Sequence, residues 1–228
     1  MTCYNELGSV MNPTDTPARP RLLLADDHRI LMEGVRKLLE AEFDIIGTAA
    51  DGRELVTLVE SLQPDVVVLD IGMPLLNGIE ASRQIRQKSQ KSRIVILTQQ
   101  TARPYIREAF DAGAMAYVLK QSAPRELTIA IQRALAGELY ISEMLREAGI
   151  VPQPEGSPHV SKAFGLTPRQ REVLQLVAEG KAAKEIANLL GISVKTVEFH
   201  KMSIMEELGM RTTAELTRYA MQHGIVNN

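Results

Sequence analysis

The chain has 228 residues, enough for one large domain or two small ones with separate hydrophobic cores. Its hydrophobic content of 45% and charged content of 24% are ordinary for a globular protein in water. No run approaches the roughly 18 apolar residues that a membrane span requires. A single cysteine excludes an intramolecular disulfide and is typical of a reducing compartment. These features predict a cytoplasmic protein with no membrane partner.

The two ends of the chain differ in composition and charge. Residues 1–20 are polar and Pro-rich and lack the charged-then-apolar pattern of an export signal, so we expect a disordered leader. The net charge of −2 is unevenly divided. Residues from Lys162 onward include nine Lys and Arg and seven acids, whereas the residues before Lys162 include 17 Lys and Arg and 21 acids. A basic C-terminal part favours nucleic acid as its partner.

Apolar runs and helix-like stretches alternate over residues 21–137. The runs have the length of buried parallel strands and cover 21–25, 43–50, 66–70, 93–98 and 116–120. The stretches between them carry apolar residues at helical spacing and cover 30–41, 52–62, 78–87, 104–111 and 124–136. Five such units in series predict a doubly wound α/β domain with a five-stranded parallel sheet.

The rest of the chain divides into a linker and an all-helical tail. Residues 138–161 contain the Pro/Gly/Ser-rich stretch of a linker, with room for a short helix at 139–148. From 162 to 228 the pattern is helical, beginning with a cap residue, Pro and Gln at Thr167, Pro168 and Gln170. The four helices expected there cover 169–179, 183–190, 194–208 and 214–223.

Polar side chains follow four of the predicted strands. Asp26 and Asp27 come after the first strand, Asp70 ends the third, Thr98 ends the fourth and Lys120 ends the fifth. Ligands of a parallel α/β sheet bind beyond the carboxyl ends of its strands. Three crowded acids repel unless a cation joins them, and oxygen ligands on an open edge suit Mg²⁺. A hydroxyl and an ammonium opposite the metal suit the oxygens of a phosphoryl group.

Each of these residues also has an ordinary interpretation. A single Asp at a strand end is usually a cap or a solvated residue, and Lys120 alone would more often be a surface charge. Four such positions at the ends of strands in one sheet favour a shared site instead.

Four separated motifs, LLLADDH, VVVLDIGMP, IVILT and GAMAYVLK, resemble the receiver domain of two-component response regulators across residues 21–137. The resemblance implies a flavodoxin-like fold in which Asp70 accepts a phosphoryl group from the phosphohistidine of a sensor histidine kinase. It also implies that Asp27, Asp70 and the backbone carbonyl of Gly72 ligate Mg²⁺, with Asp26 acting mostly through water.

The same resemblance gives roles to three further residues. Thr98 and Lys120 would bind the phosphoryl oxygens, and Tyr117 would be the aromatic residue whose inward rotation accompanies activation. On its own, Tyr117 is equally well interpreted as a half-buried core aromatic. The chain departs from the family after Thr98, where Gln99 and Gln100 replace the usual small residue. These amides could slow phosphoryl transfer or hydrogen-bond the phosphoryl group.

The tail contains the pattern of a helix-turn-helix over residues 182–201, with Gly191 in the turn and Ser193 as the cap of the second helix. Apolar residues on one face of that helix would pack inward, whereas Phe199 and Met202 lie on the other face and could contact thymine methyl groups. An alternative is a small helical bundle in which these two residues form a dimer contact. The candidate DNA contacts are Lys184, Ser193, Lys195, Thr196, Glu198, Phe199, His200, Lys201 and Met202.

A resemblance distinguishes these alternatives. The stretch LTPRQREVLQLVAEGKAAKEIANLLGISVKTVEFHKMSIMEELG is similar to LuxR-type DNA-binding domains, and the similarity extends over roughly 162–226. Two departures are AAK at 182–184, where the family often has a more polar start, and the acids Glu206 and Glu207, where basic residues are common. These acids could weaken contact with phosphates.

Together the two resemblances imply a response regulator of the NarL/FixJ type. Phosphorylation of Asp70 would shift a pre-existing equilibrium, so that a homodimer of the phosphorylated protein reads two half-sites of double-stranded promoter DNA about one helical turn apart. No enzyme site is predicted. A phosphatase with Asp70 as nucleophile would usually have a second acid where Gly72 stands, and the histidines His28, His159, His200 and His223 have no metal-ligand spacing. A further alternative is a phosphorylation-independent DNA binder whose receiver is a dimerisation module.

Overall fold

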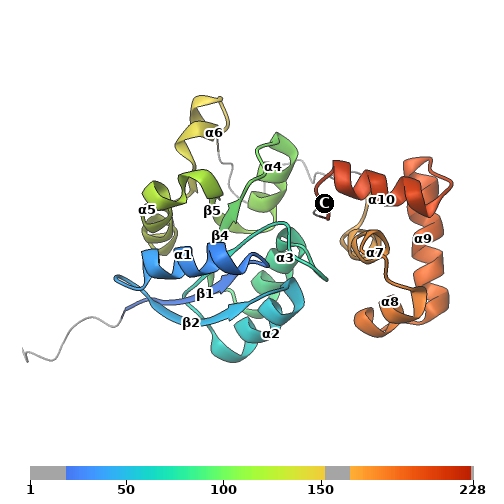
Figure 1. Cartoon of the computed structure of the whole chain (residues 1–228), viewed down its shortest axis with the longest axis horizontal. Helices are drawn as coiled ribbons and strands as arrows, with labels where there is room; N and C mark the ends of the chain where they lie inside the picture. The colour runs from blue at the N-terminus through green and yellow to red at the C-terminus, as the bar shows by residue number, and fades with distance from the viewer. Residues whose placement is uncertain (1–18, 152–164, 227–228) are drawn as a thin grey trace, which may run out of the picture.

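The computed structural model describes residues 19–151 and 165–226, which form two domains lying side by side (Figure 1). Most of the expected leader, the Pro/Gly/Ser-rich part of the expected linker and His159 lie outside the described residues. Within those residues, the N-terminal domain contains a sheet and the C-terminal domain is helical. None of the described helices is long and apolar enough to cross a membrane.

The sheet is parallel throughout, with the strand order β2-β1-β3-β4-β5-β6. Its strands are β1 (Arg21–Ala25), β2 (Asp44–Ala49), β3 (Val66–Leu69), β4 (Arg93–Thr98), β5 (Ala114–Leu119) and β6 (Tyr140–Ile141). This confirms the doubly wound α/β class followed by a helical domain. The central strands are apolar on both faces because helices cover both faces.

The sheet has six strands where the sequence predicted five. The additional strand, β6, contains only two residues, so it has no readable period, and it pairs with β5 through Ala116–Tyr140 and Tyr117–Ile141. The hydroxyl of Ser142, the residue after β6, accepts a hydrogen bond from the backbone N–H of Leu119 at 2.9 Å. The position of β6 therefore depends on pairing with the edge of β5 and not on a local sequence pattern.

Helices cover both faces of the sheet and define two apolar clusters. They are α1 (Arg29–Leu39), α2 (Gly52–Leu62), α3 (Gly78–Lys88), α4 (Arg103–Asp111), α5 (Ala123–Leu135) and the short α6 (Glu143–Glu147). A 3₁₀ turn at Lys120–Ser122 joins β5 to α5. Leu23 and Val67 point into the cluster with α2, α3 and α4, whereas Leu22 and Val66 point into the cluster with α1 and α5. Because successive side chains of a strand point to opposite faces of the sheet, each strand contributes residues to both cores.

The C-terminal domain has its own core, formed by α7 (Pro168–Ala178), α8 (Ala183–Leu190), α9 (Val194–Leu208) and α10 (Thr213–Gln222). The start of α7 is a capping box, in which the Thr167 hydroxyl accepts from the Gln170 N–H and the Gln170 side chain accepts from the Thr167 N–H. Gly191 and Gly209 end α8 and α9 in the left-handed conformation, with φ of 64° at both. Figure 1 shows α7 beside the N-terminal domain and α9 on the far side.

The loop between β3 and α3 leaves no room for a side chain at its end. A Cβ atom at Gly78 would lie 2.1 Å from the backbone carbonyl oxygen of Asp70. The first turn of α3 therefore packs directly on the backbone at the carboxyl end of β3, and the position of α3 is tied to that of Asp70.

We expect Gly78→Ala to lower the free energy of unfolding by about 1–3 kcal/mol, because the added methyl group forces α3 away from β3. Urea denaturation followed by circular dichroism measures this. Gly34→Ala is the control, since Gly34 lies within α1 with nothing within 4 Å of the added atom. That change should be neutral or stabilise by up to about 1 kcal/mol. Equal effects of the two changes would contradict the packing described.

Candidate functional site

Two acids and a lysine meet at the carboxyl edge of the sheet. The N–H of Asp70 donates to the Ala25 carbonyl at 3.0 Å, which sets Asp70 beside Asp26, each just past the end of one of two neighbouring strands. The ammonium of Lys120, at the end of β5, lies 2.7 Å from Asp26 Oδ2 and 2.7 Å from Asp70 Oδ2. Both acids are 5% exposed. The cation therefore offsets a repulsion between buried carboxylates that would otherwise be costly.

The pKa of Lys120 reflects this position. Burial acts to lower the pKa of Lys120. The negative charges of Asp70 and Asp26, and the hydrogen bonds that Lys120 donates to both, outweigh burial and raise the pKa above its ordinary 10.5. Lys120 therefore stays protonated at neutral pH, as a ligand for anionic oxygens must be.

Asp27 and His28 complete the group on its outer side. The ring Nδ1 of His28 lies 2.8 Å from Asp27 Oδ1 and 3.0 Å from Asp26 Oδ1. One ligand atom each from Asp26, Asp27, His28 and Asp70 lies within 4.8 Å of the others. His28 was not among the residues expected here, because ligand spacing was sought between histidines, whereas His28 contacts the two acids directly before it.

A cavity of about 260 Å³ opens beside these acids. It is lined by His28, Asp70, Gly72, Thr98, Gln99, Gln100 and Lys120. Thr98, at the end of β4, is 2% exposed, and its hydroxyl accepts a hydrogen bond from the Gln100 N–H at 3.4 Å. The structure thus brings Asp70, Thr98 and Lys120 to one cavity, and places Gln99 and Gln100 on its wall.

Tyr117 lies behind this cavity and is fully buried, not half-buried as the core-aromatic interpretation held. Its O–H donates to the backbone carbonyl of Gln100 at 3.0 Å, and its ring centroid lies 6.5 Å from that of Phe110. Burial, with a smaller contribution from the charge of Asp70, raises the pKa of its hydroxyl, so the neutral form persists. Tyr117 therefore points inward and is bonded to the segment that follows Thr98.

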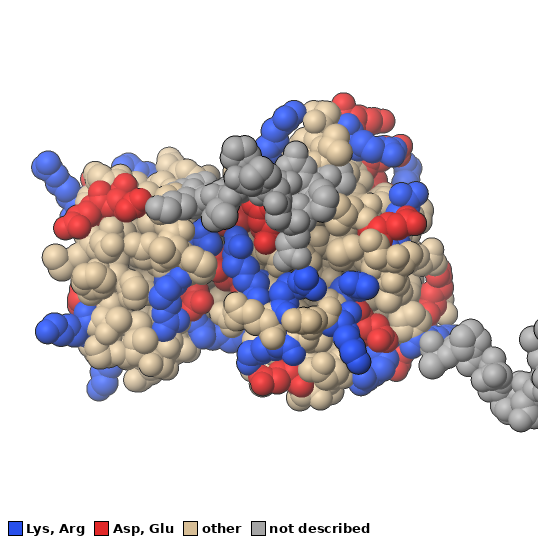
Figure 2. Space-filling view, turned by 180° about the vertical axis from the view of Figure 1, so that it is seen from behind, with Lys and Arg blue, Asp and Glu red and all other residues tan. Residues whose placement is uncertain are grey.

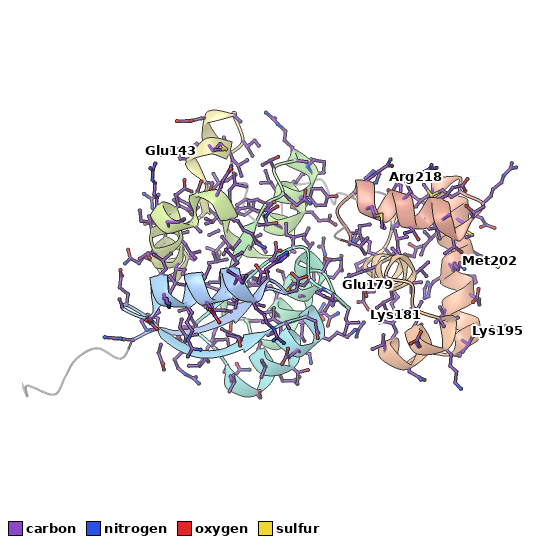
Figure 3. All side chains as sticks on the ribbon, viewed as in Figure 1. Glu143, Glu179, Lys181, Lys195, Met202 and Arg218 are labelled. Carbon is purple, nitrogen blue, oxygen red and sulfur yellow. The ribbon has the colours of Figure 1, made fainter. Side chains whose placement is uncertain are left out.

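In the C-terminal domain, α9 buries one face and exposes the other. Val197 and Ile204 are buried in the domain core, whereas Phe199 is 67% and Met202 61% exposed. Figure 3 shows Met202 and Lys195 pointing away from the N-terminal domain. Large apolar side chains exposed on a helix are informative, because burial of such groups would stabilise a contact with another molecule.

The other predicted contacts surround this face. Lys184, Ser193 and Glu198 are also exposed, and Thr196, His200 and Lys201 are half-buried. The Ser193 hydroxyl accepts from the Thr196 N–H at 3.1 Å and therefore caps α9. Figure 2 shows basic side chains projecting from the outer edge of this domain, with acidic ones among them.

Comparisons with known proteins find a family for each of the two domains. Residues 22–132 match the family model described as the response regulator receiver domain, and residues 165–220 match that of bacterial regulatory proteins of the luxR family. The chain is 35% identical to the transcriptional regulatory protein MctR of Rhizobium johnstonii, over 91% of this chain and 95% of that protein. The chain belongs to the response regulators of the NarL/FixJ type.

Two further relatives of this response regulator show similarity along nearly their whole length. It is 34% identical to the nitrate/nitrite response regulator protein NarL of Escherichia coli, over 90% of this chain and 96% of that protein. It is 36% identical to the transcriptional regulatory protein LiaR of Bacillus subtilis, over 91% of this chain and 99% of that protein.

A solved structure of the RcsB response regulator of Salmonella typhimurium is similar to this response regulator, with a TM-score of 0.62 and 28% identity, covering 89% of this chain and 96% of the other. RcsB bound to a promoter in the presence of the phosphomimetic BeF₃⁻ gives a TM-score of 0.60 at 28% identity, covering 90% of this chain and 99% of the other. The receiver and LuxR-type folds are thereby established, while the boundaries 21–137, 138–161 and 162–228 and the roles of individual residues stay predictions.

We expect Lys120→Met to lower the free energy of unfolding of the response regulator near neutral pH by about 1–3 kcal/mol, because two buried carboxylates lose their cation. Since the pKa of Lys120 is raised in the folded state, its stabilisation is complete below pH 10.5 and is lost as the pH rises through the raised value. The difference between wild type and variant should therefore be constant up to about pH 9.5 and shrink above pH 10.5.

Urea unfolding at several pH values measures this difference directly. Tyrosines also titrate in this range, but they are present in both proteins and cancel in the comparison. A difference that stayed the same at pH 11 would contradict the charge-based origin of the effect.

Proposed function

We propose that this protein is a phosphorylation-switched transcription regulator in which Asp70 is the phospho-acceptor. The observation that carries the proposal is the convergence of Asp70, Thr98 and Lys120 on one cavity at the carboxyl edge of the sheet. A nucleophilic oxygen, a hydroxyl and an ammonium are the groups that phosphoryl transfer requires.

The acidic group fits a divalent cation of the Mg²⁺ type. Asp26, Asp27 and Asp70 supply oxygen ligands that lie close together, and Asp27 is open to solvent, which suits an ion that keeps several waters. Asp27, Asp70 and the Gly72 carbonyl would hold the ion, with Asp26 acting mostly through water. When bound, Mg²⁺ would neutralise negative charge on the transferring phosphoryl group.

The residues of this chain orient the acceptor. Asp70 Oδ1 accepts a hydrogen bond from the Ile71 N–H at 2.7 Å, and Oδ2 contacts Lys120. A carboxylate oxygen of Asp70 would form the new O–P bond while the P–N bond of a phosphohistidine on a sensor histidine kinase breaks, leaving its electron pair on the imidazole. Lys120 and Thr98 would then contact the phosphoryl oxygens, and the inward position of Tyr117 would accompany activation.

The exposed face of α9 would read DNA. Phe199 and Met202 would contact bases in the major groove, and Lys184, Lys195 and Lys201 would contact phosphates, with Ser193, Thr196, Glu198 and His200 beside them. Structures of the similar protein RcsB bound to DNA, including two RcsB dimers on two parallel DNAs, support a DNA partner for this domain. We extend it to a phosphorylated homodimer on promoter DNA in the cytoplasm.

We expect acetyl phosphate with Mg²⁺ to add one phosphoryl group to the wild type and none to Asp70→Asn, because the amide oxygen is a poor nucleophile. Intact-mass spectrometry measures the modification. The same treatment should raise the affinity of the wild type for its promoter by at least about fivefold and leave Asp70→Asn unchanged. If both proteins bind equally well before and after treatment, the switch is absent and DNA binding is independent of phosphorylation.

We expect Met202→Ala to weaken binding to the strongest site found by footprinting genomic DNA by about tenfold, because an apolar contact to a base is lost. Binding to unrelated DNA should change little, since phosphate contacts remain. Met144→Ala is the matched control, as Met144 is 49% exposed on α6 in the receiver domain. Fluorescence anisotropy measures all affinities, and equal losses on specific and unrelated DNA would exclude base contact by Met202.

A further inference from the structure

A buried serine outside the cavity binds the end of β5, the strand that leads into Lys120. Ser142, the residue between β6 and α6, is 0% exposed. Its N–H donates to the Tyr117 carbonyl at 2.9 Å, and its hydroxyl accepts from the Leu119 N–H at 2.9 Å. One serine therefore binds two backbone groups of β5 directly before Lys120.

A carboxylate on α5 completes the contacts of this serine. The Ser142 hydroxyl donates to Glu126 Oε2 at 2.5 Å, and Glu126 Oε1 accepts from the Glu143 N–H at 3.4 Å. Glu126 lies in the first turn of α5. A hydrogen bond to an ionised carboxylate is stronger than one between neutral groups. The hydroxyl, as donor and acceptor at once, therefore joins α5 to β5 across the 3₁₀ turn Lys120–Ser122.

The segment that supplies Ser142 is itself anchored in the core of the sheet domain. Ile141 is 5% and Leu145 3% exposed, and both belong to the apolar cluster with α2, α3 and α4. Figure 1 shows α6 next to α5 and apart from the C-terminal domain. Ser142 lies outside the residues 22–132 that match the receiver family. Its anchored neighbours give it a fixed position relative to the sheet.

Packing on the cavity side of Lys120 is incomplete. A second cavity, of about 540 Å³, is lined by Thr98, Gln99, Thr101, Leu119, Lys120 and Gln121. Lys120 also lines the cavity that Asp70 faces. Contacts with neighbouring side chains therefore leave the end of β5 room to shift, because atoms that face a cavity lack packing partners there. The hydrogen bonds of Ser142 oppose that shift from the edge of the sheet.

The position of the Lys120 ammonium allows little error. It lies 2.7 Å from one oxygen of Asp26 and 2.7 Å from one oxygen of Asp70, so a small shift of its backbone breaks at least one contact. A phosphoryl group that is transferred to Asp70 meets the same ammonium. Misplacing a group that orients or stabilises a reaction by about 1 Å can slow the reaction about a hundredfold.

We propose that Ser142 is a positioning residue for phosphorylation, which holds the end of β5 so that Lys120 meets the phosphoryl group at Asp70. The inference rests on the proposed role of Asp70 as phospho-acceptor. Ser142 lines neither cavity and acts through the backbone of β5. Without its hydroxyl, the Leu119 N–H loses its partner in a buried setting, and the end of β5 shifts to replace the bond.

The test uses the full chain with Ser142→Ala, which removes only the hydroxyl. Acetyl phosphate with Mg²⁺ is the phosphoryl donor. An oxygen of Asp70 bonds to phosphorus while the bond from phosphorus to the acetyl oxygen breaks, and its electron pair leaves with acetate. Intact-mass spectrometry follows the labelling over time. We expect Ser142→Ala to be labelled at least about fivefold more slowly than the wild type.

Ser92→Ala is the matched control. Ser92 is 1% exposed, and its hydroxyl donates to the Pro64 carbonyl at 2.6 Å, at the amino edge of the sheet and far from Asp70. This variant loses a buried hydroxyl of the same kind, so it should lose stability but keep the labelling rate of the wild type. Ser142→Cys, whose thiol is a weaker hydrogen-bonding group, serves as the second variant if circular dichroism shows that Ser142→Ala is unfolded, and it should also be slowed.

A second measurement separates positioning from a loss of stability. In the background of Lys120→Met, Ser142→Ala should change the labelling rate by less than about twofold, because the ammonium that Ser142 positions is already absent. A structural defect that acts elsewhere in the site would slow labelling equally in both backgrounds.

An unchanged rate in folded Ser142→Ala would overturn the inference. Equal slowing by Ser142→Ala and Ser92→Ala would also overturn it, and so would equal slowing by Ser142→Ala with and without Lys120. Labelling of Asp70→Asn at the wild-type rate would instead refute the proposed acceptor, so the two failures are distinguishable.

Discussion

The contact of Lys120 with Asp26 and Asp70 is the interaction on which the rest of the site depends. A parallel sheet brings the ends of its strands to one edge, and in this chain those ends carry acids that would repel one another in a buried setting. The ammonium from β5 removes that repulsion and closes the cavity on the side of β4 and β5. The same arrangement leaves Asp27 and His28 facing solvent, where a hydrated cation can approach.

The backbone that forms this cavity also forms the contact between the domains. Met73 and Asn77, in the loop after β3, are bonded to Gln175 of α7, and Gln100, in the loop after β4, approaches Gly224 just after α10. The proposed chemistry at Asp70 and the contact with the C-terminal domain thus involve the same loops. The exposed face of α9 points away from this contact (Figure 3), so docking leaves the proposed DNA-reading side chains uncovered by the receiver.

Much of the fold was predictable because it follows from local patterns. Continuous apolar runs such as 66–69 fill two cores at once, which a parallel sheet covered on both faces requires. Cap residues and glycines marked the helices of the tail closely. The strand β6 was missed because two residues carry no period, and its place depends on pairing with β5. The contacts of His28 with Asp26 and Asp27 were not predicted, because ligand spacing was sought among histidines and not with neighbouring acids.

The sequence by itself determined the class of the fold, the order of its domains and the residues that meet at the sheet edge, since strand ends in a parallel sheet converge whatever their separation along the chain. It also placed Phe199 and Met202 on the exposed face of α9. Only the tertiary structure decided how the domains meet. Gln175 lies 98 residues from Asn77, and an isolated glutamine on a helix has the same local pattern whether it faces water or another domain. Its burial depends on how the surfaces of two separately folded domains fit together, and the spacing of residues along one helix does not reveal that fit.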